Sequence, residues 1–74
     1  MDLFENFRKN IQLLRIEKGY SANELSIELG FSLRRVSNFE QSHKPTSEEL
    51  FIISKFFNIP TDDLVHKKAK VVFQ

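Results

Sequence analysis

Two short helical patterns separated by one glycine constrain the fold of this chain more than any other feature. Leu25 and Leu29 lie four residues apart and predict the buried side of one helix, while Val36 and Phe39, three apart, predict that of a second. Gly30, between the two, supplies a positive φ, which would strain a residue with a β-carbon by roughly 1 kcal/mol or more. About three residues remain to redirect the chain, so the second helix should cross the first at ~90–120° and project from the body.

The junction between these two helices makes further demands on its residues. Ser26 must be small, because the two helices approach each other closely at that position. Phe31 is predicted to fill the wedge between them, together with the apolar residues named above. The second helix should begin at Ser32 or Leu33, with Ser32 as its cap, and a polar loop should follow it over residues 41–46.

Similar signals predict a helix before this junction. It should end at Lys18, and Gly19 supplies its left-handed closing residue. Ser21 and Glu24 then form a capping box at the start of the helix that carries Leu25. The apolar residues of the first helix recur at helical intervals, and they are Phe4, Phe7, Ile11 and Leu14.

The remainder of the chain predicts a fourth helix and a short fifth one. Thr46 or Ser47 caps the fourth helix, whose acidic first turn is favoured by the helix dipole. Asn58 should close it, Pro60 prevents its continuation, and the fifth helical turn opens at residues 61–63. The residues that define these two helices are Glu48, Glu49, Leu50, Ile53, Phe57, Thr61, Asp62, Asp63 and Leu64. We therefore predict an all-α fold, a compact five-helix bundle with a short basic tail.

The length of the chain indicates one domain, and its charges are unevenly distributed along the sequence. A chain of 74 residues makes a single domain, for which the helices imply bounds of 1–66 and a tail of 67–74. The net charge is only +1, but residues 31–46 carry +2, residues 64–74 carry +3 and residues 47–63 carry −3. A polyanion would therefore meet two basic zones, whereas the alternative is that solvated faces carry an ordinary local bias.

The composition excludes several other classes of protein. The chain has no cysteine, so it has neither disulfides nor a thiolate metal site. Its longest apolar run is far shorter than the ~20 residues that cross a bilayer, and its start does not resemble a secretory signal. We therefore expect a cytoplasmic protein that does not bind membranes.

No catalytic or metal-binding pattern stands out in the chain. His43 and His66 have no partner at ligand spacing and are predicted to be surface residues rather than metal ligands. The acidic pairs at residues 48–49 and 62–63 stand at helix starts and are explained as caps. Neither a glycine-rich phosphate loop nor a catalytic triad is evident. The sequence therefore predicts neither enzyme activity nor a cofactor.

One known family matches the chain in register over roughly residues 5–65. The matching segments are Leu14-Arg15-Ile16-Glu17-Lys18-Gly19-Tyr20-Ser21, Glu24-Leu25-Ser26, Leu29-Gly30-Phe31-Ser32, Val36-Ser37-Asn38-Phe39-Glu40, Pro45, Leu50, Ile53, Phe57-Asn58-Ile59 and Leu64. In these residues the chain resembles the Cro/repressor (XRE-type) helix-turn-helix family. The resemblance implies a lambda-repressor-like bundle, whose third helix enters the DNA major groove, and a structural ion pair between Arg15 and Glu40.

The resemblance also implies roles for residues of the third helix and its flanks. Positions that read bases in the family are occupied here by Leu33, Arg34, Ser37 and Asn38. Arginine can make a bidentate contact to guanine and asparagine to adenine, each worth ~1–3 kcal/mol of discrimination, and leucine can contact a thymine methyl. Family positions near the DNA backbone, where contacts to phosphate are expected, are occupied by Ser21, Gln41, His43 and Lys44. Arg35 lies toward one flank of the third helix and is a further candidate for a phosphate contact. The chain departs from the family at Ala22, usually glutamine, and at Ser42, usually glycine, so the corresponding contacts should differ.

These features together predict a sequence-specific DNA-binding transcriptional regulator. We expect a dimeric repressor whose partner is double-stranded DNA, without a small-molecule effector domain and open to control by a regulatory protein partner. Eight phenylalanines are a second signal, because a small bundle cannot bury them all. Phe56 adjoins Phe57, about 100° round the helix, so it marks either a dimer contact or incomplete burial, and Phe51 and Phe73 are left over as well. The alternative function is a protein-interaction module of the same fold, such as an antitoxin, that uses Phe56 and the tail.

Overall fold

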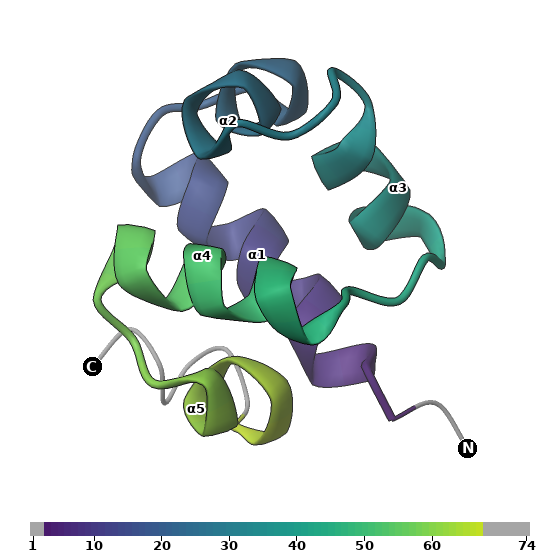
Figure 1. Ribbon diagram of the computed structural model, residues 1–74, viewed down its shortest axis with the longest axis vertical. Coiled ribbons are helices and arrows are strands. Elements are labelled where there is room, and N and C mark those ends of the chain that lie inside the picture. The colour runs from purple at the N-terminus through teal and green to yellow at the C-terminus, as the bar shows by residue number, and fades with distance from the viewer. Residues whose placement is uncertain (1–2, 68–74) are drawn as a thin grey trace.

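The computed structural model describes residues 3–67, which form five helices and, within that range, no strand. The helices are α1 (Glu5–Glu17), α2 (Ala22–Leu29), α3 (Arg35–Gln41), α4 (Ser47–Phe57) and α5 (Thr61–His66). In Figure 1, α1 and α4 cross the middle of the molecule, with α2 and α3 on one side of them and α5 on the other. The predicted all-α class with five helices is confirmed. None of the helices in the described range is both long and apolar enough to cross a membrane.

Local capping interactions fix where α1 ends and α2 begins. Gly19 follows the C-cap of α1 with φ 81°, and its N–H donates to the Ile16 carbonyl (3.0 Å). At the start of α2, the Glu24 N–H donates to the Ser21 hydroxyl (3.1 Å) and the Ser21 N–H donates to the Glu24 carboxylate (2.8 Å). Gly30 closes α2 with φ 78°. The two predicted left-handed glycines and the predicted capping box are therefore confirmed.

Signals of the same kind bound α4. Thr46 is its cap, since the Thr46 hydroxyl accepts the Glu49 N–H (3.1 Å) and the Thr46 N–H donates to the Glu49 carboxylate (2.8 Å). Asn58 ends α4 with φ 57°, a left-handed conformation in which asparagine is several-fold enriched among residues with a β-carbon. Pro60 then separates α4 from α5. These boundaries agree with the sequence, because each depends on residues only a few positions apart.

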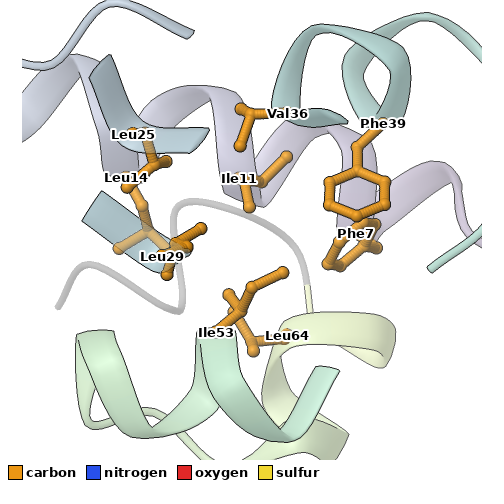
Figure 2. Packing of buried hydrophobic residues seen from close by; sticks show 9 residues of the cluster. All are labelled: Phe7, Ile11, Leu14, Leu25, Leu29, Val36, Phe39, Ile53 and Leu64. Carbon is orange, nitrogen blue, oxygen red and sulfur yellow. The ribbon is translucent and has the colours of Figure 1, made fainter. Parts of the chain in front are cut away.

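The hydrophobic core lies where the five helices meet, and each helix contributes to it (Figure 2). Its buried members are Phe7, Ile11, Leu14, Leu25, Leu29, Val36, Phe39, Ile53 and Leu64. The Phe39 ring stands edge-on to that of Phe7, with centres 5.5 Å apart, and to that of Phe31 at 6.2 Å. Phe31 and Phe57, which the helical periods also assign to the core, pack against it while remaining partly exposed. The core thus supports α3 from the side of α1.

Asn10 is a fully buried polar side chain that ties α5 to α1. Its Nδ2 donates to the carbonyls of Leu64 (2.8 Å) and Lys67 (2.9 Å). A helix ends with carbonyls that have no partner inside the helix, so the Asn10 amide satisfies groups that the end of α5 leaves open. The predicted tail begins at Lys67, and its other residues, 68–74, lie outside the described residues, as does the expectation for Phe73.

Candidate nucleic-acid interface

The turn that joins α2 to α3 is longer than the sequence predicts. α3 begins at Arg35, with Arg34 as its N-cap residue, so residues 30–34 connect the two helices. The Ser32 carbonyl accepts the Arg35 N–H (3.0 Å) across the two residues between them, which makes this stretch a separate hydrogen-bonded turn. The prediction that the third helix begins at Ser32 or Leu33, with Ser32 as its cap, is therefore wrong. Ser32 closes the turn through its backbone instead.

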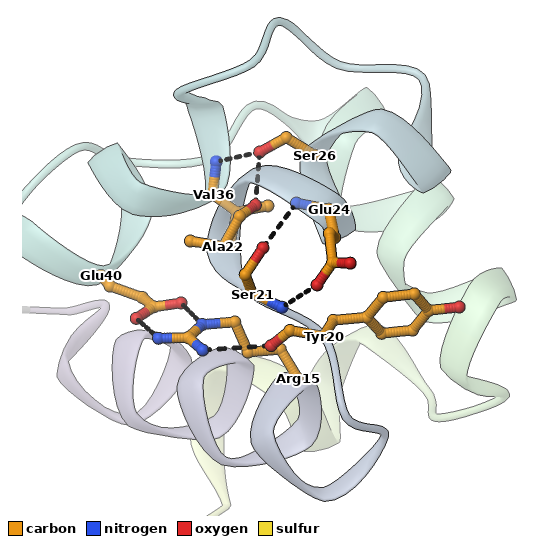
Figure 3. A network of polar contacts seen from close by, with 8 residues as sticks. All are labelled: Arg15, Tyr20, Ser21, Ala22, Glu24, Ser26, Val36 and Glu40. Carbon is orange, nitrogen blue, oxygen red and sulfur yellow. Dashed lines mark hydrogen bonds and ion pairs between the residues drawn. The ribbon is translucent and has the colours of Figure 1, made fainter.

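The first turn of α3 is held by a side chain of α2. The buried Ser26 hydroxyl donates to the Ala22 carbonyl (3.0 Å) and accepts the Val36 N–H (3.0 Å), as Figure 3 shows. Arg34 provides no side-chain cap, and the first N–H groups of a helix need acceptors from outside it. The sequence indicates only that Ser26 must be small. Its hydroxyl explains why serine, and not alanine, suits this position.

Ser26→Ala is expected to lower the free energy of unfolding by about 1–3 kcal/mol, the cost of leaving the buried Val36 N–H without an acceptor. Alanine lacks only the hydroxyl, so little of this loss comes from packing. Chemical denaturation followed by circular dichroism measures it. Ser32→Ala is the matched control, because α3 has no side-chain cap there, and it should change stability by less than ~0.5 kcal/mol. Equal losses from the two variants would contradict this hydrogen-bonding pattern.

The side of α3 that faces away from the core carries the predicted base-reading residues. Ser37 and Asn38 lie on α3 between its buried residues and are partly exposed. Leu33 and Arg34 precede them in the turn and are exposed, Leu33 by 51 %. The structure thus brings the four residues together, although Leu33 and Arg34 stand ahead of the helix rather than on it. We call these four residues the α3 outer face.

Polar residues flank the α3 outer face at both ends of the helix-turn-helix. The four exposed ones that the sequence assigns to phosphate contacts are Ser21 before α2 and Gln41, His43 and Lys44 at and after the end of α3. The Asn38 carbonyl accepts the N–H groups of Ser42 and His43 (3.0 Å each) and so shapes the loop that follows. Ser42 has φ −165°, an extended conformation open to any residue. This loop therefore does not need the glycine that is usual in the family.

Arg35, the remaining predicted phosphate contact, differs from the other four because its side chain is held by other residues of the protein. Its guanidinium forms a bidentate ion pair with Glu49 of α4, with Nε–Oε2 at 2.6 Å and Nη2–Oε1 at 2.8 Å. Nη2 also donates to the Lys44 carbonyl (3.3 Å), and the guanidinium carbon lies 4.6 Å from the centre of the Phe39 ring. The hydrogen bonds from Arg35, and those from Thr46, hold the pKa of Glu49 below its ordinary value. Sequence reasoning missed this pair, whose members are 14 residues apart in different helices.

A second ion pair ties the end of α3 to α1, as the resemblance to the family implies. Arg15 donates from Nε and Nη2 to the Glu40 carboxylate (2.6 and 3.0 Å) and from Nη1 to the Tyr20 carbonyl (3.2 Å) (Figure 3). The two side chains are 19 % and 12 % exposed. The hydrogen bond to Glu40 raises the pKa of Arg15 above its ordinary value. This pair fixes the position of α3 on α1.

The remaining site predictions concern dimerisation and metals. Phe56 is 40 % exposed and packs against the rings of Tyr20 (6.1 Å between centres) and Phe57 (5.0 Å). Its role as a dimer contact stays a prediction. Within residues 3–67, no group of three or more histidine, cysteine, aspartate or glutamate side chains is placed to hold a metal ion.

Comparison with known proteins adds one finding to this geometry. A helix-turn-helix family model matches residues 11–64, which is more than half of the chain and includes α2, α3 and α4 completely. A search of curated proteins and a search of solved structures found no match.

Proposed function

The chain belongs to the Cro/repressor (XRE-type) helix-turn-helix family, and we propose that it acts in the cytoplasm as a sequence-specific transcriptional repressor. Its fold is of the lambda-repressor-like type, and its family is one of DNA-binding regulatory domains rather than of enzymes. In this proposal, a dimer places α3 in the major groove of an operator. The observation that carries the proposal is the α3 outer face, whose residues are exposed or partly exposed on α3 and in the turn before it. Three other helices hold α3 in place.

The side chains of the α3 outer face suit the groups that base edges offer in the major groove. Arg34 can donate two hydrogen bonds to guanine, and Asn38 can pair with adenine. Leu33 offers no hydrogen bond and contacts a thymine methyl, while the Ser37 hydroxyl suits several bases. The major groove is about 12 Å wide and admits a helix, so these residues can lie along the base edges together.

The flanking residues supply contacts that position the protein without reading sequence. Ser21 borders one end of the helix-turn-helix, and Gln41, His43 and Lys44 border the other. Contacts of this kind to phosphate fix the register of a protein on the duplex and provide most of the affinity. We leave Arg35 out of this group, because Glu49 already holds its guanidinium.

Phe56 supports the dimer in this proposal. A large apolar side chain that is 40 % exposed can gain further burial against a second copy. In a two-fold dimer the same patch meets itself, and the two copies of α3 are set about 34 Å apart, on one side of the duplex.

The first test is binding to mixed genomic duplex at several salt concentrations. Phosphate contacts release counterions, so the logarithm of the affinity should fall linearly as the logarithm of the salt concentration rises. The slope should be on the order of several units. A weak and flat response would overturn the proposal and favour the protein-interaction module instead. Two observations favour this second candidate. The net charge is only +1, and Ala22 stands where the family usually has glutamine.

Arg34→Ala and Lys44→Ala are expected to weaken DNA binding in different ways. Arg34→Ala should abolish the preference at one or two base pairs, a loss of about 1–3 kcal/mol on the preferred duplex only. Lys44→Ala should weaken all duplexes alike and reduce the salt slope by about one unit. Competition binding with duplexes that the wild-type protein selects from a random pool measures both effects. Equal losses across all sequences from both variants would contradict the assigned roles.

A further inference from the structure

We propose that Glu49 is a positioning residue for DNA recognition, which sets the orientation of α3 through Arg35 while also capping α4. This inference rests on the proposed function and goes beyond it, because it assigns Arg35 and Glu49 to the support of the α3 outer face. It also gives DNA recognition a dependence on a carboxylate, a group that DNA itself repels.

One carboxylate serves both helices. Glu49 Oε1 accepts hydrogen bonds from the Thr46 N–H (2.8 Å) and from Arg35 Nη2 (2.8 Å), and Oε2 accepts one from Arg35 Nε (2.6 Å). Thr46 is the cap of α4, and Arg35 is the first residue of α3. The start of the DNA-facing helix is thereby fastened to the start of α4 through a single side chain.

The other contacts of Arg35 make its connection to Glu49 rigid; we call this connection between α3 and α4 the Arg35–Glu49 joint. Its guanidinium lies over the Phe39 ring at 4.6 Å, and its Nη2 donates to the Lys44 carbonyl (3.3 Å). The planar guanidinium offers its donors in a fixed fork that fits a carboxylate at two points. Arg35 therefore sets the position of the core side of α3 and of the loop that carries His43 and Lys44.

The joint completes a set of three anchors on α3. Ser26 holds the first turn from α2, and the pair of Arg15 with Glu40 holds the last turn from α1. The pair of Arg35 with Glu49 restrains α3 from the side of α4 through two side-chain hydrogen bonds. Loss of this pair frees α3 to tilt and moves the α3 outer face relative to the flanking phosphate contacts.

The two roles open to Arg35 predict opposite effects for Glu49→Gln. If Arg35 contacts phosphate and Glu49 only caps α4, removal of the negative charge should raise affinity for every duplex. If Glu49 positions α3, the same variant should lower affinity for the operator by about tenfold, the size of one charge-assisted hydrogen bond. Affinity for random duplex and the salt slope should change little, because no phosphate contact is lost.

The experiment compares Glu49→Gln with Glu48→Gln, a neighbouring exposed residue in the same helical turn that gives the same change in charge. The probes are a duplex selected by the wild-type protein from a random pool and a random-sequence duplex, each titrated at several salt concentrations. Glu48→Gln should leave the ratio of the two affinities unchanged, whereas Glu49→Gln should reduce it about tenfold. Unchanged or tighter operator binding by Glu49→Gln would overturn the positioning role.

Arg35→Lys covers the case in which Glu49→Gln does not fold. Lysine keeps the positive charge but not the fork, so a phosphate contact would survive the change and the bidentate joint would not. We expect a loss of operator affinity of about tenfold with an unchanged salt slope, and retained affinity would overturn the assignment. A wild-type protein without salt-dependent DNA binding would overturn the proposed function, and this role with it. DNA binding by the wild type that is insensitive to both variants would overturn this role alone.

Discussion

Phe39→Ala is expected to cost about 3–5 kcal/mol of unfolding free energy, the range for deletion of a buried phenylalanine ring. Phe39 is fully buried, stands edge-on to Phe7 and Phe31, and supports the guanidinium of Arg35. A domain of this length has a total stability of roughly 4–11 kcal/mol. The substitution should therefore remove between about a quarter and all of the folding stability.

Urea denaturation monitored by circular dichroism measures this loss. Phe51→Ala is the matched control, because Phe51 is 58 % exposed on α4 and lies outside the core. It should cost less than about 1 kcal/mol, since little apolar area leaves a buried environment. A Phe39→Ala variant as stable as Phe51→Ala would show that α3 is not seated on the core as described here.

Glu40→Gln should produce the second largest loss of stability. Removal of one partner of a buried ion pair costs about 3–5 kcal/mol, and we expect about 2–3 kcal/mol here because the side chains of Arg15 and Glu40 are still 19 % and 12 % exposed. Glutamine has nearly the shape of glutamate, so the loss comes from the guanidinium of Arg15 that is left without its carboxylate. Thermal or chemical denaturation at neutral pH and moderate salt provides the measurement.

The control for Glu40→Gln is an ion pair at the surface. Glu5→Gln removes the same charge from the exposed pair of Glu5 with Lys9 (3.8 Å), one helical turn apart, and should cost no more than about 0.5 kcal/mol. Similar values for the two variants would mean that burial adds nothing to the pair of Arg15 with Glu40. That result would remove one of the three anchors assigned to α3.

Features of the fold that depend on neighbouring residues could be predicted from the sequence. The capping box of Ser21 with Glu24 involves residues three positions apart, and Gly19 closes α1 through its own backbone. The helical periods identified the core for a similar reason, because each amphipathic helix has one apolar side to bury. The pair of Arg15 with Glu40 is distant in sequence and was accessible only through the resemblance to a family.

Features that depend on distant partners could not be predicted in the same way. The residues around a serine look the same in the sequence whether the serine caps a helix or closes the turn before it. For this reason Ser32 was wrongly predicted to be the cap of α3. In the folded chain, the hydroxyl of Ser26 rather than that of Ser32 accepts an N–H of the first turn of α3. Arg35 likewise has the local signature of a solvated cation beside a DNA-facing surface. In the sequence, the position of Glu49 in the first turn of α4 is enough to account for its acidic side chain. Its ion pair with Arg35 therefore could not be predicted.

The amide of Asn10 has a practical consequence for labelling the protein. It holds the backbone of Lys67 beside α1, and α5 lies across the molecule from α2 and from the turn before α3 (Figure 1). A fluorophore or affinity tag attached after Lys67 therefore starts on the side of the molecule opposite α2. The same label at Asn23, exposed in the first turn of α2, would stand beside Ser21, which is a predicted phosphate contact.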